Sequence, residues 1–165
     1  QKYDFVLSCP RYDFVLRRRD MDNRTLEKLH RINYLIAETD ALYHQASLKL
    51  GISDSAMRVL YTVYDCGGSC QLSDIYKRSG ISKQTVNSAL RKLEADGVIY
   101  LEPEAGRGKR VRLTRSGEDY VSRTAARLYE AECEALSTWS AGEIDAHISL
   151  LEKYAASLGE QLKRL

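Results

Sequence analysis

The chain has 165 residues, of which 44% are hydrophobic, and it carries a formal net charge of +2 at pH 7. These values are ordinary for one compact globular protein. No apolar run reaches membrane-spanning length and no signal-peptide pattern is present, so we expect a cytoplasmic protein with no membrane partner. The charge is uneven, because residues 71–123 hold 11 Lys+Arg against 7 Asp+Glu, a local net charge of +4.

Residues 1–20 form an N-terminal extension with an internal repeat. The sequence Lys-Tyr-Asp-Phe-Val-Leu at 2–7 is nearly repeated as Arg-Tyr-Asp-Phe-Val-Leu at 11–16, and both phenylalanines of the chain lie in these copies. The alternation of apolar and polar residues fits an arm that pairs with itself or crosses to a partner subunit. The alternative is an upstream extension from a different start, and the sequence leaves both open.

Residues 21–50 are predicted to form a long helix that packs against other helices. Apolar side chains recur at alternating spacings of three and four residues, as in the seam of a coiled coil. The seam consists of Leu29, Ile32, Ile36, Thr39, Tyr43, Ala46 and Leu50.

The chain contains four cysteines: Cys9, Cys66, Cys70 and Cys133. Cys66 and Cys70 have a C-x3-C spacing where a helix is expected to end and a short strand to begin, so zinc or a disulfide is conceivable there. No second cysteine pair accompanies them, and the three histidines are dispersed along helices. We therefore expect no metal site and reduced cysteines, with thiol-based redox sensing kept as an alternative.

The segment from Leu72 to Ala95 predicts two helices around a tight turn. Leu72, Ile75 and Tyr76 give the first helix a short apolar stripe, and the turn follows at residues 79–81. The second helix is predicted over 83–96, between an N-cap at Ser82 and a left-handed glycine at Gly97. Its buried face has helical spacing and comprises Val86, Ala89, Leu90 and Leu93.

The opposite face of this second helix carries polar and cationic side chains that a core does not require. Donors and acceptors of this length can reach base edges and phosphates in the major groove. We therefore predict DNA contacts from Ser82, Lys83, Gln84, Thr85, Asn87, Ser88 and Arg91.

Residues 98–102 and 110–114 are predicted to form the two strands of a hairpin. The tip between them is basic, and residues 107–115 hold five Lys+Arg and no acidic residue. Such a tip beside a recognition helix suits phosphate and minor-groove contacts, because a narrow groove attracts arginine. We predict these contacts from Arg107, Lys109 and Arg110.

Residues 115–165 are predicted to be helical, with one helix over about 115–138 and another to the end of the chain. The last helix carries a second seam of apolar residues. This seam consists of Ile144, Ile148, Leu151, Ala155, Leu158, Leu162 and Leu165. Because one small domain cannot bury three long helices alone, a homodimer is expected, with a monomeric helical bundle as the alternative.

The segment from Leu72 to Thr114 resembles the winged helix-turn-helix of the multiple antibiotic resistance regulator (MarR) family. The likeness lies in the run ISKQTVNSALRKLEADGVI, in the strand ending at Leu113-Thr114 and in the following Ser116-Gly117, and it extends over about residues 22–165. It implies a mainly α protein with a small β-hairpin wing. The DNA-binding domain would cover 51–114, and the helical dimerisation region 21–50 and 115–165.

The resemblance also implies how the wing is used. In this family a wing arginine, with an aspartate two positions before it, reaches the minor groove. Arg107 matches the arginine, whereas Ala105 stands at the aspartate position. Glu104 or Glu102 could orient Arg107 instead.

The resulting functional prediction is a homodimeric transcriptional repressor that binds pseudo-palindromic double-stranded DNA. Two recognition helices about 34 Å apart would read the two half-sites. The resemblance further implies a small effector, and a group of tyrosines suits an aromatic or phenolic one, although a tyrosine-rich core is the alternative. These candidates are Tyr34, Tyr43, Tyr61 and Tyr64.

Two other functional classes are a partner-binding protein and an enzyme. A winged-helix protein that serves a structural or partner-binding role would bind DNA with little sequence preference. An enzyme is not expected, because no nucleophile elbow, phosphate-binding glycine loop or histidine–carboxylate spacing is present. No cofactor is expected either.

Overall fold

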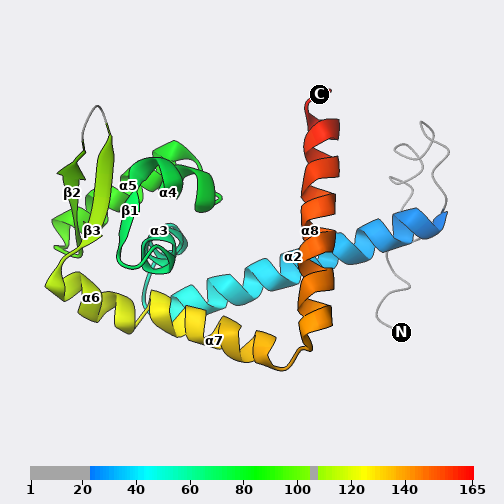
Figure 1. Cartoon of the computed structure of the whole chain (residues 1–165), viewed down its shortest axis with the longest axis horizontal. Helices are drawn as coiled ribbons and strands as arrows, with labels where there is room; N and C mark the ends of the chain where they lie inside the picture. Colours follow the sequence, from blue (N-terminus) through cyan, green and yellow to red (C-terminus); the bar gives the residue numbers. More distant parts are fainter. Residues whose placement is uncertain (1–22, 105–107) are drawn as a thin grey trace. The chain divides into compact units, whose positions relative to one another are not determined.

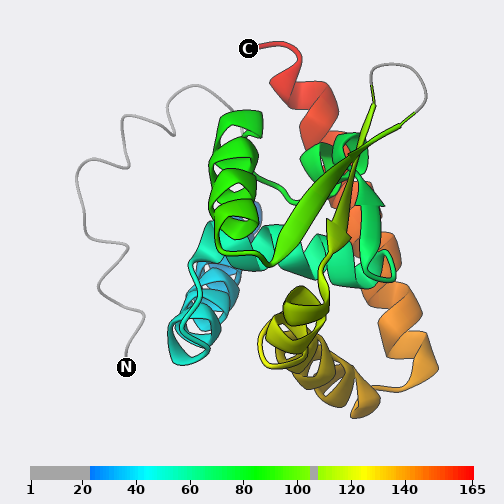
Figure 2. The same cartoon turned by 90° about the vertical axis from the view of Figure 1, so that its left-hand side faces the viewer.

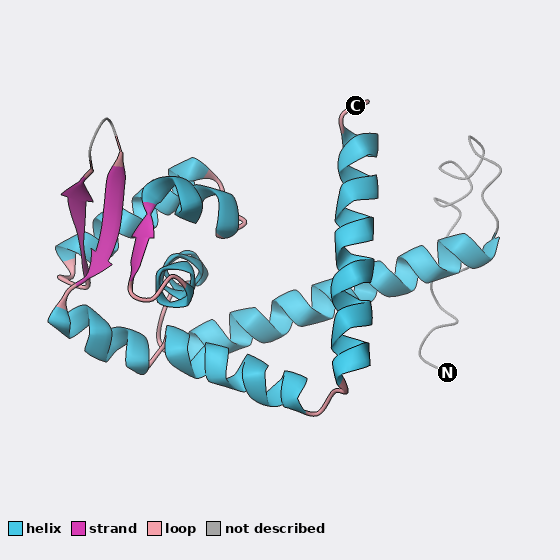
Figure 3. Ribbon diagram, viewed as in Figure 1, coloured by secondary structure: helices cyan, strands magenta, loops and turns pink. Residues whose placement is uncertain are grey.

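The computed structural model describes residues 23–104 and 108–165. The predictions for residues 1–20, Cys9, Ala105 and Arg107 therefore lie outside the described residues. The chain forms two compact units, and the boundary between them falls between Gln45 and Ala46, inside the first helix described. The elements in chain order are α2 (Asn23–Lys49), α3 (Asp54–Asp65), β1 (Ser69–Gln71), α4 (Leu72–Arg78), α5 (Lys83–Ala95), β2 (Ile99–Pro103), β3 (Lys109–Leu113), α6 (Arg115–Ser122), α7 (Ala125–Ser137) and α8 (Ala141–Leu162) (Figures 1 and 3).

The second unit contains a winged helix-turn-helix. Its three-stranded antiparallel sheet has the order β1-β3-β2, and Val111 of the central strand faces Cys70 on one side and Leu101 on the other. β2 and β3 form a hairpin that reaches out from the helices (Figure 2). The predicted fold class, mainly α with a small β wing, is confirmed. The strands occupy 99–103 and 109–113, so each predicted strand is displaced by one residue.

The core of this unit joins the helix-turn-helix to the sheet. Leu60 of α3, Ile75 of α4, Val86 of α5 and Val111 of β3 are fully buried. All four residues predicted for the buried face of α5 are buried as well. Burial of such apolar side chains contributes about 1.5–3 kcal/mol each, so the orientation of α5 about its own axis is fixed by packing.

The predicted boundaries of α5 are confirmed by its caps. The Ser82 hydroxyl accepts a hydrogen bond from the Thr85 amide at 3.1 Å, and this satisfies one of the free amides of the first turn. Gly97 follows the C-cap with φ +70°, a left-handed conformation that glycine adopts without strain.

The predicted single helix over 115–138 is wrong, because the chain breaks between α6 and α7. Arg123 caps α6, and Thr124 has φ −126° and ψ −92°, which is not helical. The buried Thr124 hydroxyl donates to the Tyr120 carbonyl at 2.8 Å. Such a local bond from threonine to the backbone competes with continued helix, and it is not visible in apolar spacing.

The start of α6 is fastened to the end of α5. The Thr114 hydroxyl donates to the Gly97 carbonyl at 2.6 Å and accepts from the Gly117 amide at 2.9 Å. The Ser116 hydroxyl donates to the same Gly97 carbonyl at 3.0 Å. These bonds join the start of α6 to Gly97, the residue that follows the C-cap of α5.

Large apolar side chains remain exposed on the outer helices. On α2 they include Ile32, Leu35 and Ile36, and no residue of α8 is buried. Within the described ranges, no helix combines the length and apolar character needed to cross a membrane.

Candidate nucleic-acid interface

The exposed face of α5 carries the residues that the sequence predicted for it. Ser82, Lys83, Gln84, Thr85, Ser88 and Arg91 are exposed, and Asn87 is half-buried. Because the opposite face is anchored in the core, these side chains are presented on one side of a rigid helix. Six of them come from the first nine residues of the helix and leave its last turn uninvolved.

Tyr76 of α4 contacts two of these residues. Its hydroxyl donates a hydrogen bond to Asn87 Oδ1 at 2.8 Å, and the Lys83 ammonium lies 5.6 Å from the centre of its ring. The bond occupies the amide oxygen of Asn87. Because Tyr76 holds this oxygen, the orientation of the Asn87 NH2 group is fixed as well. The sequence assigned Tyr76 to the apolar stripe, so this positioning contact was missed.

A groove runs between the helix-turn-helix and the wing. Its volume is about 580 Å³, and both α5 and β3 contribute to its wall. The lining residues are Leu72, Ser73, Tyr76, Asn87, Leu90, Arg91, Leu101, Gly108 and Lys109. Asn87, Arg91 and Lys109 thus share one concave surface.

Two acidic residues, Glu102 of β2 and Glu104 just after it, neutralise part of the positive charge of the wing. Arg110 Nε lies 2.6 Å from Glu104 Oε1, and Arg112 Nε lies 2.5 Å from Glu102 Oε2. In the pairing of β2 with β3, Glu102 lies opposite Arg110, whereas its ion-pair partner is Arg112. Both ion pairs therefore run diagonally across the hairpin. Arg110 also reaches Ser69 Oγ at 3.5 Å. Of the predicted wing contacts, Lys109 is exposed, whereas the guanidinium of Arg110 is already paired.

These pairs bear on the expected role of Arg107. Glu104 and Glu102, the two carboxylates considered as partners for Arg107, are bound to Arg110 and Arg112. Residues 107–115 contain no acid, so the sequence suggested more free positive charge than the wing has. The neutralising carboxylates are those of Glu102 and Glu104, on the other side of the hairpin.

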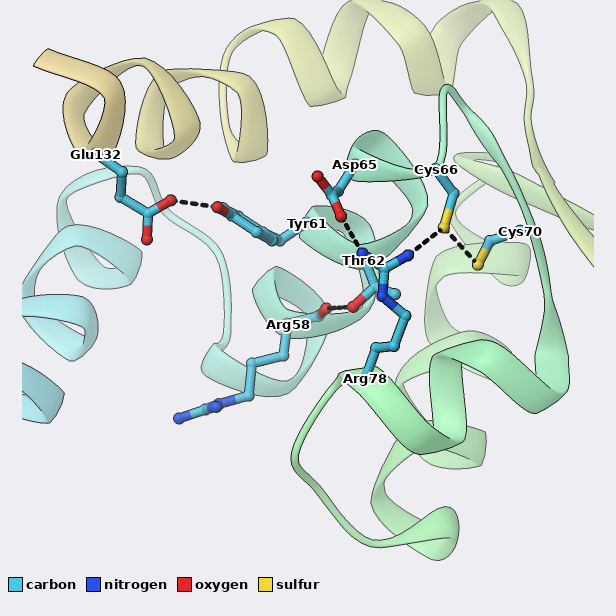
Figure 4. A network of polar contacts seen from close by, with 8 residues as sticks. All are labelled: Arg58, Tyr61, Thr62, Asp65, Cys66, Cys70, Arg78 and Glu132. Carbon is cyan, nitrogen blue, oxygen red and sulfur yellow. Dashed lines mark hydrogen bonds and ion pairs between the residues drawn. The ribbon is translucent and has the colours of Figure 1, made fainter. Parts of the chain in front are cut away.

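The candidate tyrosines lie in both units. Tyr61 and Tyr64 of α3 pack against Tyr129 of α7, with ring centroids 5.9 and 5.5 Å apart, and the Tyr61 hydroxyl donates to Glu132 (Figure 4). Tyr34 and Tyr43 are exposed on α2. The sequence missed Tyr129, whose partners lie more than sixty residues away along the chain.

Comparison with known proteins identifies the winged helix. The model of the MarR family matches residues 50–110, which span α3 to the start of β3. The winged-helix region belongs to the MarR family. Proteins of this family are DNA-binding transcription regulators, so the family gives no support for an enzymatic role. No curated protein shows a significant sequence match to the chain.

Solved structures of MarR-family regulators share the fold. NMB1585 of Neisseria meningitidis is 20% identical, with 87% of this chain and 99% of that chain covered and a TM-score of 0.70. MepR of Staphylococcus aureus in complex with DNA is 25% identical, with 77% and 93% covered and a TM-score of 0.61. BpsR of Bordetella bronchiseptica, whose DNA binding is regulated by 6-hydroxynicotinic acid, is 19% identical, with 76% and 98% covered and a TM-score of 0.57.

Proposed function

We propose that this MarR-family chain is a transcriptional repressor that reads pseudo-palindromic duplex DNA as a homodimer. One observation carries the proposal: α5 buries its apolar face and exposes a polar face on which the predicted contact residues include two cations, Lys83 and Arg91. A helix with that division of faces suits the major groove, where side chains meet base edges and phosphates. Lys109 and Arg107 would add contacts from the wing.

The experiment that tests this function is selection of duplexes from a randomised pool by the full chain. A regulator with two equivalent reading helices enriches an inverted repeat whose half-sites are about 10 base pairs apart, centre to centre. The enriched duplex should bind on the order of a thousandfold more tightly than a scrambled one at the same salt concentration. Enrichment of no motif would instead identify a winged-helix protein of structural or partner-binding function.

The homodimer is proposed because large apolar side chains on α2 and α8 are exposed in the part of the chain that the structure describes. Ile148 and Leu151 of α8 are 49% and 54% exposed, and the predicted seam continues through Leu158 and Leu162. Contiguous exposed apolar surface of this kind marks an interaction site, and most soluble homo-oligomers are twofold dimers. We propose 21–50 and 115–165 as the dimerisation region and 51–114 as the DNA-binding domain.

Replacing Leu151 with arginine is expected to weaken dimerisation at least about tenfold, since a charge placed in an apolar interface must be desolvated without a partner. Sedimentation velocity over a concentration series measures this change. Glu152→Arg is the control, because the neighbouring α8 residue points to another side of the helix. A wild-type chain that sediments as a monomer at every concentration would refute the dimer.

Glu104→Gln is expected to strengthen DNA binding without changing base preference. The substitution removes a negative charge from the wing and releases Arg110, now 2.6 Å from Glu104. The slope of log affinity against log salt concentration should become steeper by up to about 1, as for one added phosphate contact. Glu160→Gln, which removes the partner of Lys163 on α8, is the matched control. An unchanged slope would argue against a role for the wing.

A small aromatic or phenolic effector is part of the proposal. The half-buried rings of Tyr61 and Tyr64 meet Tyr129, and these rings combine apolar surface with hydroxyls that bind polar groups. Regulation of BpsR by 6-hydroxynicotinic acid offers a precedent for an aromatic effector of this fold. Tyr34 and Tyr43 of α2 are further candidates.

A further inference from the structure

Two thiols meet at the junction between α3 and β1. Cys66 is the C-cap residue of α3, and Cys70 is the middle residue of β1. Gly67 and Gly68, with φ +75° and +84°, reverse the chain between them in a conformation that residues with a Cβ adopt only at a cost. The two Sγ atoms lie 2.9 Å apart (Figure 4). A disulfide bond of about 2.05 Å would need a further approach of only about 1 Å.

A guanidinium group lies against one of the thiols. Arg78 Nη1 is 3.0 Å from Cys66 Sγ, and Arg78 Nη2 forms an ion pair with Asp65 (Figure 4). The negative charge of Cys66 is the largest cause of the raised pKa of Arg78. A cation beside a sulfur atom is typical of cysteines that react with oxidants.

The two cysteines differ in access to solvent. Cys66 is half-buried, whereas Cys70 is 2% exposed. Burial, followed by the hydrogen bond and the charge of Cys66, raises the pKa of Cys70 to about 12. Cys66 is therefore suited to react first with an oxidant from solvent. Cys70 remains a protonated thiol beside it.

We propose that Cys66 and Cys70 form a peroxide-responsive disulfide switch within the helix-turn-helix. The Cys66 thiolate attacks hydrogen peroxide, the O–O bond breaks, and the leaving hydroxide takes a proton to become water, which leaves a sulfenic acid on Cys66. The Cys70 sulfur then attacks the Cys66 sulfur, the S–O bond breaks, and the hydroxyl group leaves with the Cys70 proton as a second water. The two thiols lose two electrons in total, and the peroxide gains them.

The switch reaches the candidate DNA-binding face through α4. Oxidation changes the Cys66 sulfur that Arg78 contacts at the end of this helix, while Tyr76 on the same helix holds Asn87 of α5. Loosening of α4 should disturb that contact and weaken DNA binding. This last step rests on the proposed function, whereas the thiol chemistry does not.

Intact mass measurement of the full chain during treatment with hydrogen peroxide tests the chemistry. The wild-type chain should lose about 2 Da, and peptide mapping should place the bond between Cys66 and Cys70. Cys70→Ser should instead accumulate a sulfenic acid on Cys66 that a dimedone reagent traps. Arg78→Gln should slow the reaction at least about threefold, because the thiolate loses its neighbouring cation. Arg58→Gln is the matched control, since Arg58 points away from the thiols (Figure 4).

Failure to form this disulfide in the wild-type chain, or equal rates for Arg78→Gln and Arg58→Gln, overturns the proposed chemistry. Binding of the reduced and oxidised wild-type chain to the selected duplex is measured next. We expect affinity to fall at least about threefold on oxidation, to return with a dithiol reductant, and to stay unchanged in Cys70→Ser. Equal affinities of the two forms would overturn the switch. No sequence-specific binding by the reduced form would reject the proposed function instead, and the mass measurement would still decide the thiol chemistry.

Discussion

Replacing Gly117 with alanine is expected to destabilise the winged helix by about 3 kcal/mol or more, a large effect for the addition of one methyl group. A Cβ atom at this position would lie 1.9 Å from the Val98 carbonyl oxygen and 2.9 Å from the Val98 carbonyl carbon. Both are backbone atoms at the start of the turn into β2, so no side-chain rotation relieves the clash. The higher helix propensity of alanine offsets only about 1 kcal/mol of this cost.

Denaturant unfolding, followed by circular dichroism, measures the effect of Gly117→Ala. Gly142→Ala is the control, because no atom lies within 4 Å of a Cβ built on this α8 residue. The control should leave stability unchanged or raise it by up to about 1 kcal/mol. If both substitutions gave equal unfolding midpoints, the tight contact between α6 and the residue before β2 would not exist in solution.

Removing the two cations of the predicted contact set on α5, by Lys83→Ala together with Arg91→Ala, is expected to weaken DNA binding on the order of a hundredfold. Hydrogen bonds to charged groups contribute about 1.5–3 kcal/mol each, and each tenfold change in affinity corresponds to about 1.4 kcal/mol. Fluorescence anisotropy with the selected duplex measures the loss. The salt dependence should also become shallower by about 2, as two phosphate contacts disappear.

The matched control for this pair is Lys92→Ala together with Arg127→Ala. It removes the same two kinds of charge from exposed positions outside the predicted contact set, with Lys92 near the end of α5 and Arg127 on α7. The control should retain affinity within about threefold, because distant exposed charges are screened by salt. Equal losses in the two double variants would mean that the positive field of the domain, not this face of α5, binds DNA.

The sequence predicted α5 well because the apolar residues of this helix follow a single helical period. Val86, Ala89, Leu90 and Leu93 recur at helical spacing, and burial of that stripe determines which residues face outward. The caps at Ser82 and Gly97 are local features with clear residue preferences. Local periodicity and capping therefore gave the boundaries and exposed face of the helix.

Features that depend on distant contacts could not be predicted. Thr124, at the break between α6 and α7, is buried by the fold around it, and the charge of the wing depends on which carboxylates the hairpin places beside Arg110 and Arg112. In the sequence, Ser116-Gly117 is marked only by its likeness to the family. The structure explains the glycine, because the Val98 carbonyl leaves no room for a Cβ atom at Gly117. Each of these features depends on tertiary contacts, which the spacing of apolar residues does not reveal.

The central claim is that the exposed face of α5 reads DNA bases, and Gln84→Ala tests it most directly. The wild-type chain and Gln84→Ala are each used to select duplexes from the same randomised pool, with Gln161→Ala of α8 as the control. A glutamine amide can pair with the edge of adenine, and such a pair discriminates against other bases by about 1–3 kcal/mol. We predict that Gln84→Ala loses preference at one symmetry-related pair of positions and keeps the rest of the motif, whereas Gln161→Ala selects the wild-type motif. An identical motif from all three proteins would contradict the proposed docking of α5.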